Sequence, residues 1–326
     1  MVDNHNRTIN YLRLSVTDRC NLRCIYCMPE EGIRFVPHND ILTYEEMLRV
    51  VRLCVRKGIR KVRLTGGEPL VRQGIVGFIE KLNKIEGLEK IAVTTNGVLL
   101  KEFASSLRQC GIRHINVSMD TLRRDRFAHI TRRDVFDKVW AGIEEAESLG
   151  FDPIKINVVA LRGVNDDEVL DFARLTLEKP YRIRFIEMMP IGENNSWSKE
   201  RFISAEEILA RILPLGKTVR VGSGPLDGPA DYYRLEGSRG MIGFIGALSN
   251  HFCARCNRLR LTASGQLRGC LFSDDETDIR TPLRRGEGDD VLLRLIEETI
   301  LNKPASHGVR EWMPRNCVRP MNRIGG

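Results

Sequence analysis

The sequence lacks the features that would place a protein in a membrane or outside the cell. It contains no run of about eighteen apolar residues, so nothing in it is expected to span a bilayer. Residues 1–7 are polar and lack the apolar centre of a secretory signal. Because disulfides persist mainly in secreted proteins, the nine cysteines are expected to stay reduced. We therefore expect a cytoplasmic protein with free thiols and no membrane partner.

Low-complexity tracts and strongly charged tails are missing as well. The 326 residues suffice for one large domain or two unequal ones. The net charge is +8, and 39 of the 51 basic residues are arginine, which binds phosphate and carboxylate in a bidentate way. This balance suits a nucleic acid, a phosphorylated small molecule or a solvated surface, and composition does not decide among them.

From residue 11 to about residue 189, short β-branched runs alternate with longer amphipathic stretches. This rhythm is typical of parallel strands joined by right-handed helical crossovers, and six units predict an α/β fold, a partial (β/α)6 barrel of the TIM type. The expected strands are Tyr11–Thr17, Lys61–Thr65, Ile91–Thr95, Ile115–Met119, Ile154–Ala160 and Arg182–Glu187. The expected helices are Tyr44–Arg56, Val76–Ile85, Leu100–Cys110, Phe136–Leu149 and Asp167–Leu177.

The rhythm changes after Gly192, where shorter strands and a Gly/Pro-rich stretch follow. We place the boundary near residue 195, which gives a barrel at 1–195 and a C-terminal α+β extension at 196–326 that closes the barrel mouth. The elements expected in the extension are a helix at Ala205–Leu213 and strands at Tyr232–Leu235, Met241–Ile245 and Leu259–Thr262.

Side chains alternate faces along a strand, and in these strands one face is apolar and the other polar. The polar sets are Arg13, Ser15 and Thr17; Arg63 and Thr65; Asn116, Ser118 and Asp120; and Lys155 and Asn157. If the apolar face meets the helices, the polar face points into the barrel, where unpaired charges are costly. We interpret this as a chamber for an anionic substrate. Internal ion pairs, or a reversed parity, are the alternatives.

The first cysteine set, Cys20, Cys24 and Cys27, is spaced C-x3-C-x2-C and follows the first strand. Three thiolates can hold a [4Fe–4S] cluster and leave one iron open, since four normally hold it. Structural zinc needs four protein ligands, and c-type haem needs a His where Met28 stands. An iron–sulfur cluster is favoured over zinc or unrelated cysteines.

A second set, Cys253, Cys256 and Cys270, has the spacing C-x2-C-x13-C. It indicates a second cluster, and the alternative is a zinc ribbon completed by His251. Arg258 and Arg260 share a strand face beside it and could bind phosphate as a fork. The other thiols, those of Cys54, Cys110 and Cys317, are expected to be structural.

The turn 65–69 reads T-G-G-E-P and follows the second strand, at the end where barrels place their chemistry. With the C-x3-C-x2-C loop, whose Tyr26 precedes the last cysteine, it resembles the radical S-adenosylmethionine (SAM) enzymes. The resemblance implies that Cys20, Cys24 and Cys27 hold a cluster that cleaves SAM to a 5′-deoxyadenosyl radical. The residues expected around SAM are Tyr26, Gly67, Ser118 and Met189.

The whole chain, through C-N-R-L-R-L-T at 256–262 and a terminal Gly325-Gly326, resembles the molybdenum-cofactor biosynthesis protein A family, the GTP 3′,8-cyclases. The resemblance implies that the radical abstracts the ribose 3′ hydrogen of GTP, that the ribose carbon then attacks guanine C8, and that Cys253, Cys256 and Cys270 hold a second [4Fe–4S] cluster facing guanine. The implied GTP contacts are Arg13, Arg63, Thr94, Lys155, Arg258 and Arg260, with Arg13 and Lys155 also catalytic, and Arg184 is a further candidate.

The expected partners are an electron donor of the flavodoxin or ferredoxin type and the cyclic pyranopterin monophosphate synthase that receives the product. A homodimer is allowed, and nucleic acid is not expected. The glycine tail is expected to reach the active site. Two alternatives remain. One is a radical SAM enzyme acting on peptide or RNA, and binding of RNA would weaken steeply with salt. The other is a zinc or iron–sulfur regulator that binds nucleic acid, whose zinc form would be colourless.

Overall fold

The computed structural model describes residues 1–192, 198–222, 224–309, 317 and 319–325. Within these residues the strands form one twelve-stranded sheet, in the order β12-β11-β10-β1-β2-β3-β4-β5-β6-β9-β8-β7. The pairs from β10 to β9 along this order are parallel, and the pairs at both ends are antiparallel. The protein therefore has a mixed α/β fold, as predicted.

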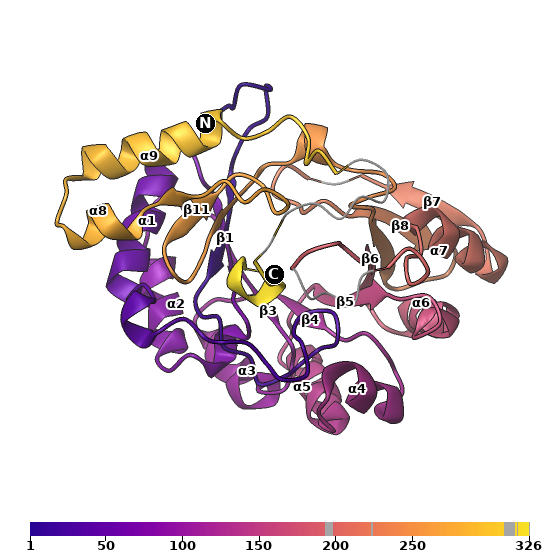
Figure 1. The fold of residues 1–326 in the computed structure, drawn as a ribbon. Helices are drawn as coiled ribbons and strands as arrows, with labels where there is room; N and C mark the ends of the chain where they lie inside the picture. The colour runs from indigo at the N-terminus through magenta and orange to yellow at the C-terminus, as the bar shows by residue number, and fades with distance from the viewer. Residues whose placement is uncertain (193–197, 223, 310–316, 318, 326) are drawn as a thin grey trace.

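The first six strands and the helices between them follow the predicted alternation, and Figure 1 shows these helices along the outside of the strands. Strand bounds agree with the prediction to within two residues. The strands are β1 (Tyr11–Ser15), β2 (Lys61–Thr65), β3 (Lys90–Thr95), β4 (His114–Ser118), β5 (Ile154–Ala160) and β6 (Arg182–Glu187). The helices are α1 (Tyr44–Arg56), α2 (Ile75–Asn83), α3 (Leu100–Gln109), α4 (Arg124–Thr131), α5 (Phe136–Ser148) and α6 (Val169–Glu178).

The hydrophobic core lies between these strands and helices. Leu12 and Leu14 of β1 and Val62 of β2 are fully buried in one apolar cluster with side chains of α1 and α2. Helix α1 begins at a capping box, in which the Thr43 hydroxyl accepts from the Glu46 N–H and the Glu46 carboxylate accepts from the Thr43 N–H. The apolar strand face therefore meets the helices, and the polar face is left for the opposite side.

The C-terminal part of the chain extends the sheet at both edges, because β9 pairs with β6 and β10 pairs with β1. Its elements are α7 (Ala205–Ile212), β7 (Thr218–Val221), β8 (Asp231–Leu235), β9 (Met241–Ile245), β10 (Arg258–Leu261), β11 (Gln266–Arg268), β12 (Thr277–Asp278), α8 (Arg280–Arg284) and α9 (Asp289–Leu301). The predicted boundary near residue 195 falls among residues 193–197, which lie outside the described residues.

Helices α4, α8 and α9 lie outside the predicted elements. Figure 1 shows α9 beside α1, and Lys57, at the end of α1, pairs with Glu297 of α9 at 2.7 Å. No helix in the described ranges is both long and apolar enough to cross a membrane.

Candidate active site

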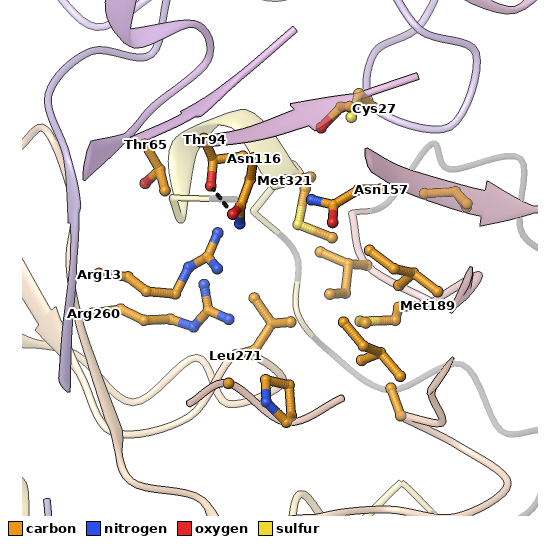
Figure 2. A pocket seen from close by; sticks show the side chains of 18 of the residues that line it. Arg13, Cys27, Thr65, Thr94, Asn116, Asn157, Met189, Arg260, Leu271 and Met321 are labelled. Carbon is orange, nitrogen blue, oxygen red and sulfur yellow. Dashed lines mark hydrogen bonds between the residues drawn. The ribbon is translucent and has the colours of Figure 1, made fainter. Parts of the chain in front are cut away.

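One cavity of about 310 Å³ lies at the polar face of the parallel strands, and all six cysteines of the two sets line it. Figure 2 shows Arg13 and Arg260 with their guanidinium groups side by side in this chamber, and Cys27 and Met189 farther round its wall. The sequence separates the two cysteine sets by more than two hundred residues, and the fold brings them to a single chamber.

Strand pairing places the two sets at opposite ends of the chamber. Cys20 follows the carboxyl end of β1, whereas Cys256 precedes the amino end of β10, which runs parallel to β1. Cys270 follows β11, which runs antiparallel to β10 and so returns to the same end. At about 3.3 Å per residue, the five residues of β1 span about 17 Å. A ligand that meets both sets must therefore be an extended molecule.

The thiols of the first set are free and half-buried. Their loop is fixed by backbone bonds to the end of α4, where the N–H groups of Arg23 and Ile25 donate to the carbonyls of Thr131 and Ile130. Burial raises the pKa of Cys20 to about 11 and also raises the pKa values of Cys24 and Cys27 well above the ordinary thiol value. Only a bound cation would hold these thiols as thiolates at neutral pH. Three thiols with no further metal-ligating side chain placed beside them in the described part of the chain fit an iron–sulfur cluster.

The glycine turn after β2 packs directly against this loop. The Gly67 N–H donates to the Thr17 carbonyl at 2.7 Å, and a Cβ on Gly67 would overlap the carbonyl of Arg19, so a larger residue does not fit. The Glu68 carboxylate accepts from Thr95 Oγ1 at 2.8 Å and from the Asn96 N–H at 2.6 Å. Glu68 thus ties the end of β2 to the end of β3, and burial raises the pKa of this carboxyl to about 7.

The other residues expected around SAM also line the chamber, namely Tyr26, Ser118 and Met189. The Tyr26 hydroxyl donates to Asp120 Oδ2 at 2.5 Å, which links the cysteine loop to the end of β4. Asp120 Oδ1 accepts from the Val159 N–H of β5 at 2.8 Å. Asp120, which the parity analysis places in the interior but not among the site residues, therefore orients Tyr26.

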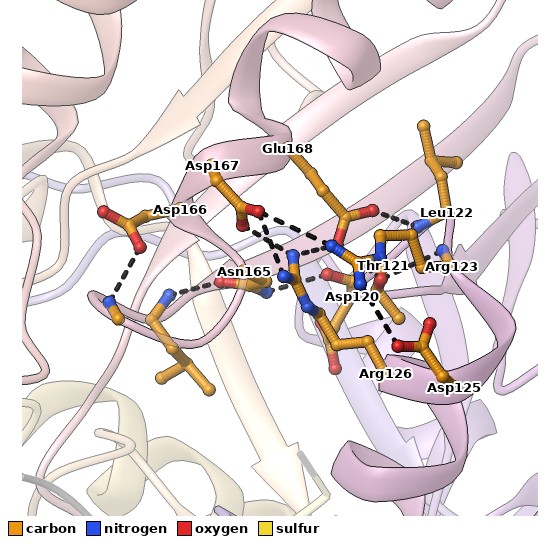
Figure 3. A network of polar contacts seen from close by, with 12 residues as sticks. Asp120, Thr121, Leu122, Arg123, Asp125, Arg126, Asn165, Asp166, Asp167 and Glu168 are labelled. Atoms are coloured by element: carbon orange, nitrogen blue, oxygen red, sulfur yellow. Dashed lines mark hydrogen bonds and ion pairs between the residues drawn. The ribbon is translucent and has the colours of Figure 1, made fainter.

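A network of polar side chains contacts Asp120 and the residues that follow it (Figure 3). The side-chain amide of Asn165 donates to the Asp120 carbonyl at 2.7 Å. The Glu168 carboxylate, 2% exposed, accepts from Thr121 Oγ1 at 2.6 Å and from Arg126 Nη1 at 2.5 Å. The side-chain oxygens of Glu168 and Asn165 are thus occupied by donors within the protein, and we assign this network to holding the loop after β4 in place.

The second cysteine set has different electrostatic surroundings. Burial raises the pKa of the Cys256 thiol, but the charges of Arg258 and Lys303 outweigh burial and bring it to about 6. The Arg258 guanidinium lies 3.8 Å from the Cys256 sulfur and over the Phe252 ring. The Cys256 thiol is therefore well suited to bind a cationic cluster as a thiolate, whereas burial raises the pKa of Cys253. Across the described residues, no three Cys, His, Asp or Glu side chains are placed to hold a single metal ion.

Between the cysteine sets lie the predicted phosphate contacts. Arg13, Arg63, Thr94, Arg258 and Arg260 all line the chamber, as does the further candidate Arg184. Lys155 does not line it, but it pairs in register with Asn116, which does. It is 5% exposed, and burial together with the charges of Arg184 and Arg63 lowers its pKa to about 6.

Sequence reasoning missed two functional candidates, Tyr11 and Lys61, which carry the same strand parity as Arg13 and Arg63. Tyr11 lines the chamber, and the Lys61 ammonium lies 4.3 Å from the centre of the Tyr11 ring. Parity places both on the interior face, but their contact with each other depends on the register of β1 with β2. In addition, Asn116 Oδ1 and Arg184 Nε are buried without a hydrogen-bond partner among the described atoms, which marks a polar ligand site.

The last described residues enter the chamber, as predicted for the tail. The Gly325 carbonyl accepts from Arg13 Nε and from Arg260 Nη1, each at 3.1 Å. Asn322 is buried and donates to the Asp18 carbonyl at 2.8 Å, so it anchors the tail beside the first cysteine loop. Gly326 lies outside the described residues.

Comparison with known proteins agrees with this geometry. Residues 14–176 match the family model described as the Radical SAM superfamily, and residues 181–309 match Molybdenum Cofactor Synthesis C. A GTP 3′,8-cyclase of Desulforamulus reducens is 52% identical over 331 residues, and one of Heliobacterium modesticaldum is 50% identical over 329, with 100% of both chains covered in each case.

Among solved structures, SuiB of Streptococcus suis bound to S-adenosylmethionine has a TM-score of 0.61 at 14% identity, over 84% of this chain and 64% of that one. At this identity the likeness concerns the fold alone. The full-length similarity to the curated cyclases is what establishes the family, and the chain therefore belongs to the GTP 3′,8-cyclases of the radical SAM superfamily.

Proposed function

We propose that this enzyme cyclises GTP between its ribose 3′ carbon and guanine C8, as a radical SAM step of molybdenum cofactor synthesis. The observation that carries the proposal is the single basic chamber with three thiols at each end. A [4Fe–4S] cluster on Cys20, Cys24 and Cys27 would supply an open iron and the electron for reductive SAM cleavage. The chain's own contribution is to bind, orient and enclose the two substrates.

In this proposal SAM lies at the first cysteine set, lined by Tyr26, Gly67, Ser118 and Met189. The triphosphate of GTP lies among the arginines of β1, β2 and β10, with guanine toward Cys253, Cys256 and Cys270. The expected phosphate contacts are Arg13, Arg63, Lys155, Arg258 and Arg260, joined by Lys61 and Arg184, and Thr94 is expected to contact the nucleoside. Arg13 and Lys155 are also expected to act during catalysis.

The finer architecture belongs to the proposal as well. The six strands from β1 to β6 would form a partial (β/α)6 barrel at 1–195, and the extension at 196–326 would close its mouth. The enzyme would be cytoplasmic, would take electrons from a flavodoxin or ferredoxin type of donor and would hand its product to cyclic pyranopterin monophosphate synthase. A homodimer is compatible with this arrangement, and nucleic acid is not an expected partner.

The test is an anaerobic assay of reconstituted, reduced protein with SAM, with and without GTP. Mass spectrometry should find 5′-deoxyadenosine together with a cyclised nucleotide of the same mass as GTP. Cys256→Ala should lose the cyclised nucleotide, while Cys110→Ala, at a buried thiol outside the chamber, should keep it. If 5′-deoxyadenosine forms but is indifferent to GTP, the substrate assignment is wrong.

A further inference from the structure

Tyr11 occupies an unusual position for a tyrosine. It is 1% exposed, begins β1 on the interior face and lines the chamber among cations. Its hydroxyl oxygen accepts a short hydrogen bond from Nε of Arg63. Its ring faces the Lys61 ammonium at 4.3 Å, and the Arg63 guanidinium lies 5.7 Å from the ring centre. One side chain therefore touches two of the expected phosphate contacts.

We propose that Tyr11 is a positioning residue for the triphosphate of GTP: its oxygen holds the Arg63 guanidinium toward the chamber, and the cations that surround this oxygen are the ones that bind the triphosphate. This inference rests on the proposed function of the chamber. An arginine fixed through Nε can still donate to phosphate from its two terminal nitrogens, each of which carries two N–H groups. One of these, Nη1, already points to Thr94 Oγ1 at 3.2 Å, toward the chamber wall.

The charges around Tyr11 agree with this role. Burial alone raises the pKa of the Tyr11 hydroxyl, but nearby positive charges bring it down to about 7. The cations responsible, largest effect first, are Arg63, Lys61, Arg13 and Arg258. The charges of Lys90 of β3 and Arg184 of β6 also act on the Tyr11 hydroxyl, and Asp227, in the loop before β8, interacts electrostatically with the nearby lysines.

A triphosphate brings its own negative charge to these cations and so disfavours the tyrosinate form. At about pH 8, one unit above the pKa of Tyr11 in the substrate-free enzyme, GTP binding should therefore convert the tyrosinate to the neutral phenol. The enzyme should take up a proton as it does so. The measurement is the loss of the near-ultraviolet tyrosinate band when GTP is added to anaerobic holoenzyme. The same titration on Tyr11→Phe provides the cluster background, and it should show no tyrosinate change.

Binding affinity gives a second measurement that a merely structural role would not reproduce. In Tyr11→Phe, loss of a hydrogen bond to a charged group should weaken GTP binding by about ten- to a hundred-fold. Guanosine, which has no phosphates, should bind the variant and the wild type within about threefold of each other. Tyr44→Phe is the matched control, because Tyr44 also carries an arginine, Arg72, over its ring at 4.1 Å, but lies outside the chamber.

The outcomes separate this inference from the function it rests on. Failure of wild-type protein to bind GTP would overturn the proposed function itself. If the wild type binds GTP without losing any tyrosinate band, or if Tyr11→Phe weakens GTP and guanosine equally, the positioning role of Tyr11 is refuted. The wild-type spectrum decides the matter even where Tyr11→Phe does not fold.

Discussion

Lys155 gives the most quantitative prediction of the proposed site, because its charge should change when substrate binds. The residue is 5% exposed, and its ammonium forms no hydrogen bond or ion pair with another described residue. Burial, followed by the charges of Arg184 and Arg63, lowers its pKa to about 6. In the substrate-free enzyme at about pH 7.5, Lys155 is therefore mostly neutral.

A bound triphosphate favours the charged form and raises the Lys155 pKa back toward its ordinary value. Binding then takes up about one proton through this lysine at about pH 7.5. The GTP-bound state holds more protons than the substrate-free state, so the affinity for GTP falls as pH rises. It is highest below the pKa of Lys155 in the substrate-free enzyme, which is about 6. The expected fall is up to about tenfold per pH unit until the bound-state pKa is reached.

The assay is anaerobic titration calorimetry with GTP, run in two buffers of different ionisation enthalpy. Lys155→Met should take up about one proton fewer than the wild type, and its affinity should depend less on pH. Proton exchange by GTP itself is common to both proteins and cancels in the difference. Lys81→Met, at an exposed lysine paired with Glu45, is the control and should match the wild type. Equal proton uptake by Lys155→Met and the wild type would refute the reasoning.

Two further predictions concern the cysteines and the network behind Asp120. Cys24→Ala should abolish SAM cleavage, whereas Cys256→Ala should retain the first cluster's electron paramagnetic resonance signal and lose the cyclised product; retained turnover in Cys24→Ala would contradict the assignment of the first set. Glu168→Ala leaves Arg126 without its buried partner and should lower the free energy of unfolding by about 3–5 kcal/mol. Asp171→Ala, which breaks an exposed pair, should cost under about 1 kcal/mol in the same denaturant titration, and equal losses would show that burial does not matter here.

Strand periodicity was sufficient to predict the parallel core, because each strand carries one face of branched apolar residues and one polar face. It did not predict that β9 and β10 join the two edges of the sheet. Those strands are short, and their partners lie far away in sequence, so no local pattern records the pairing. Helix α4 was missed because its sequence, RDRFAHIT, buries only three residues and is polar elsewhere. Helix α9 is amphipathic, so the periodicity of its sequence could have predicted it.

The candidate site was predictable where chemistry is encoded in spacing, as in the cysteine sets, and where parity is regular, as at Arg13 and Arg63. It was not predictable where a role depends on what lies beside a residue in space. Tyr11 and Lys61 are paired only through the register of β1 with β2. Likewise, the Glu68 carboxylate accepts hydrogen bonds from Thr95 and Asn96 because the ends of β2 and β3 meet in space.

The partners of the buried cations distinguish the chamber from the rest of the molecule. Elsewhere, the buried arginines Arg7 and Arg268 are held by the carboxylates of Asp3 and Glu276, and the half-buried Arg126 is held by Glu168. In the chamber, the described partners are uncharged or weakly acidic oxygens: Gly325 for Arg13 and Arg260, Tyr11 for Arg63, Asn157 for Arg184 and Leu226 for Lys61.

A carboxylate would neutralise these cations permanently and compete with any anionic ligand, whereas a carbonyl, amide or phenol satisfies hydrogen bonds while leaving most of the positive charge in place. The substrate-free protein bears the cost of several unneutralised charges in one chamber, and a triphosphate removes that cost when it binds. Introducing a carboxylate should therefore have the opposite effects on stability and function. Asn157→Asp, beside Arg184, should raise the melting temperature of the free enzyme and weaken GTP binding, and a variant that gains stability while binding GTP normally would contradict this account.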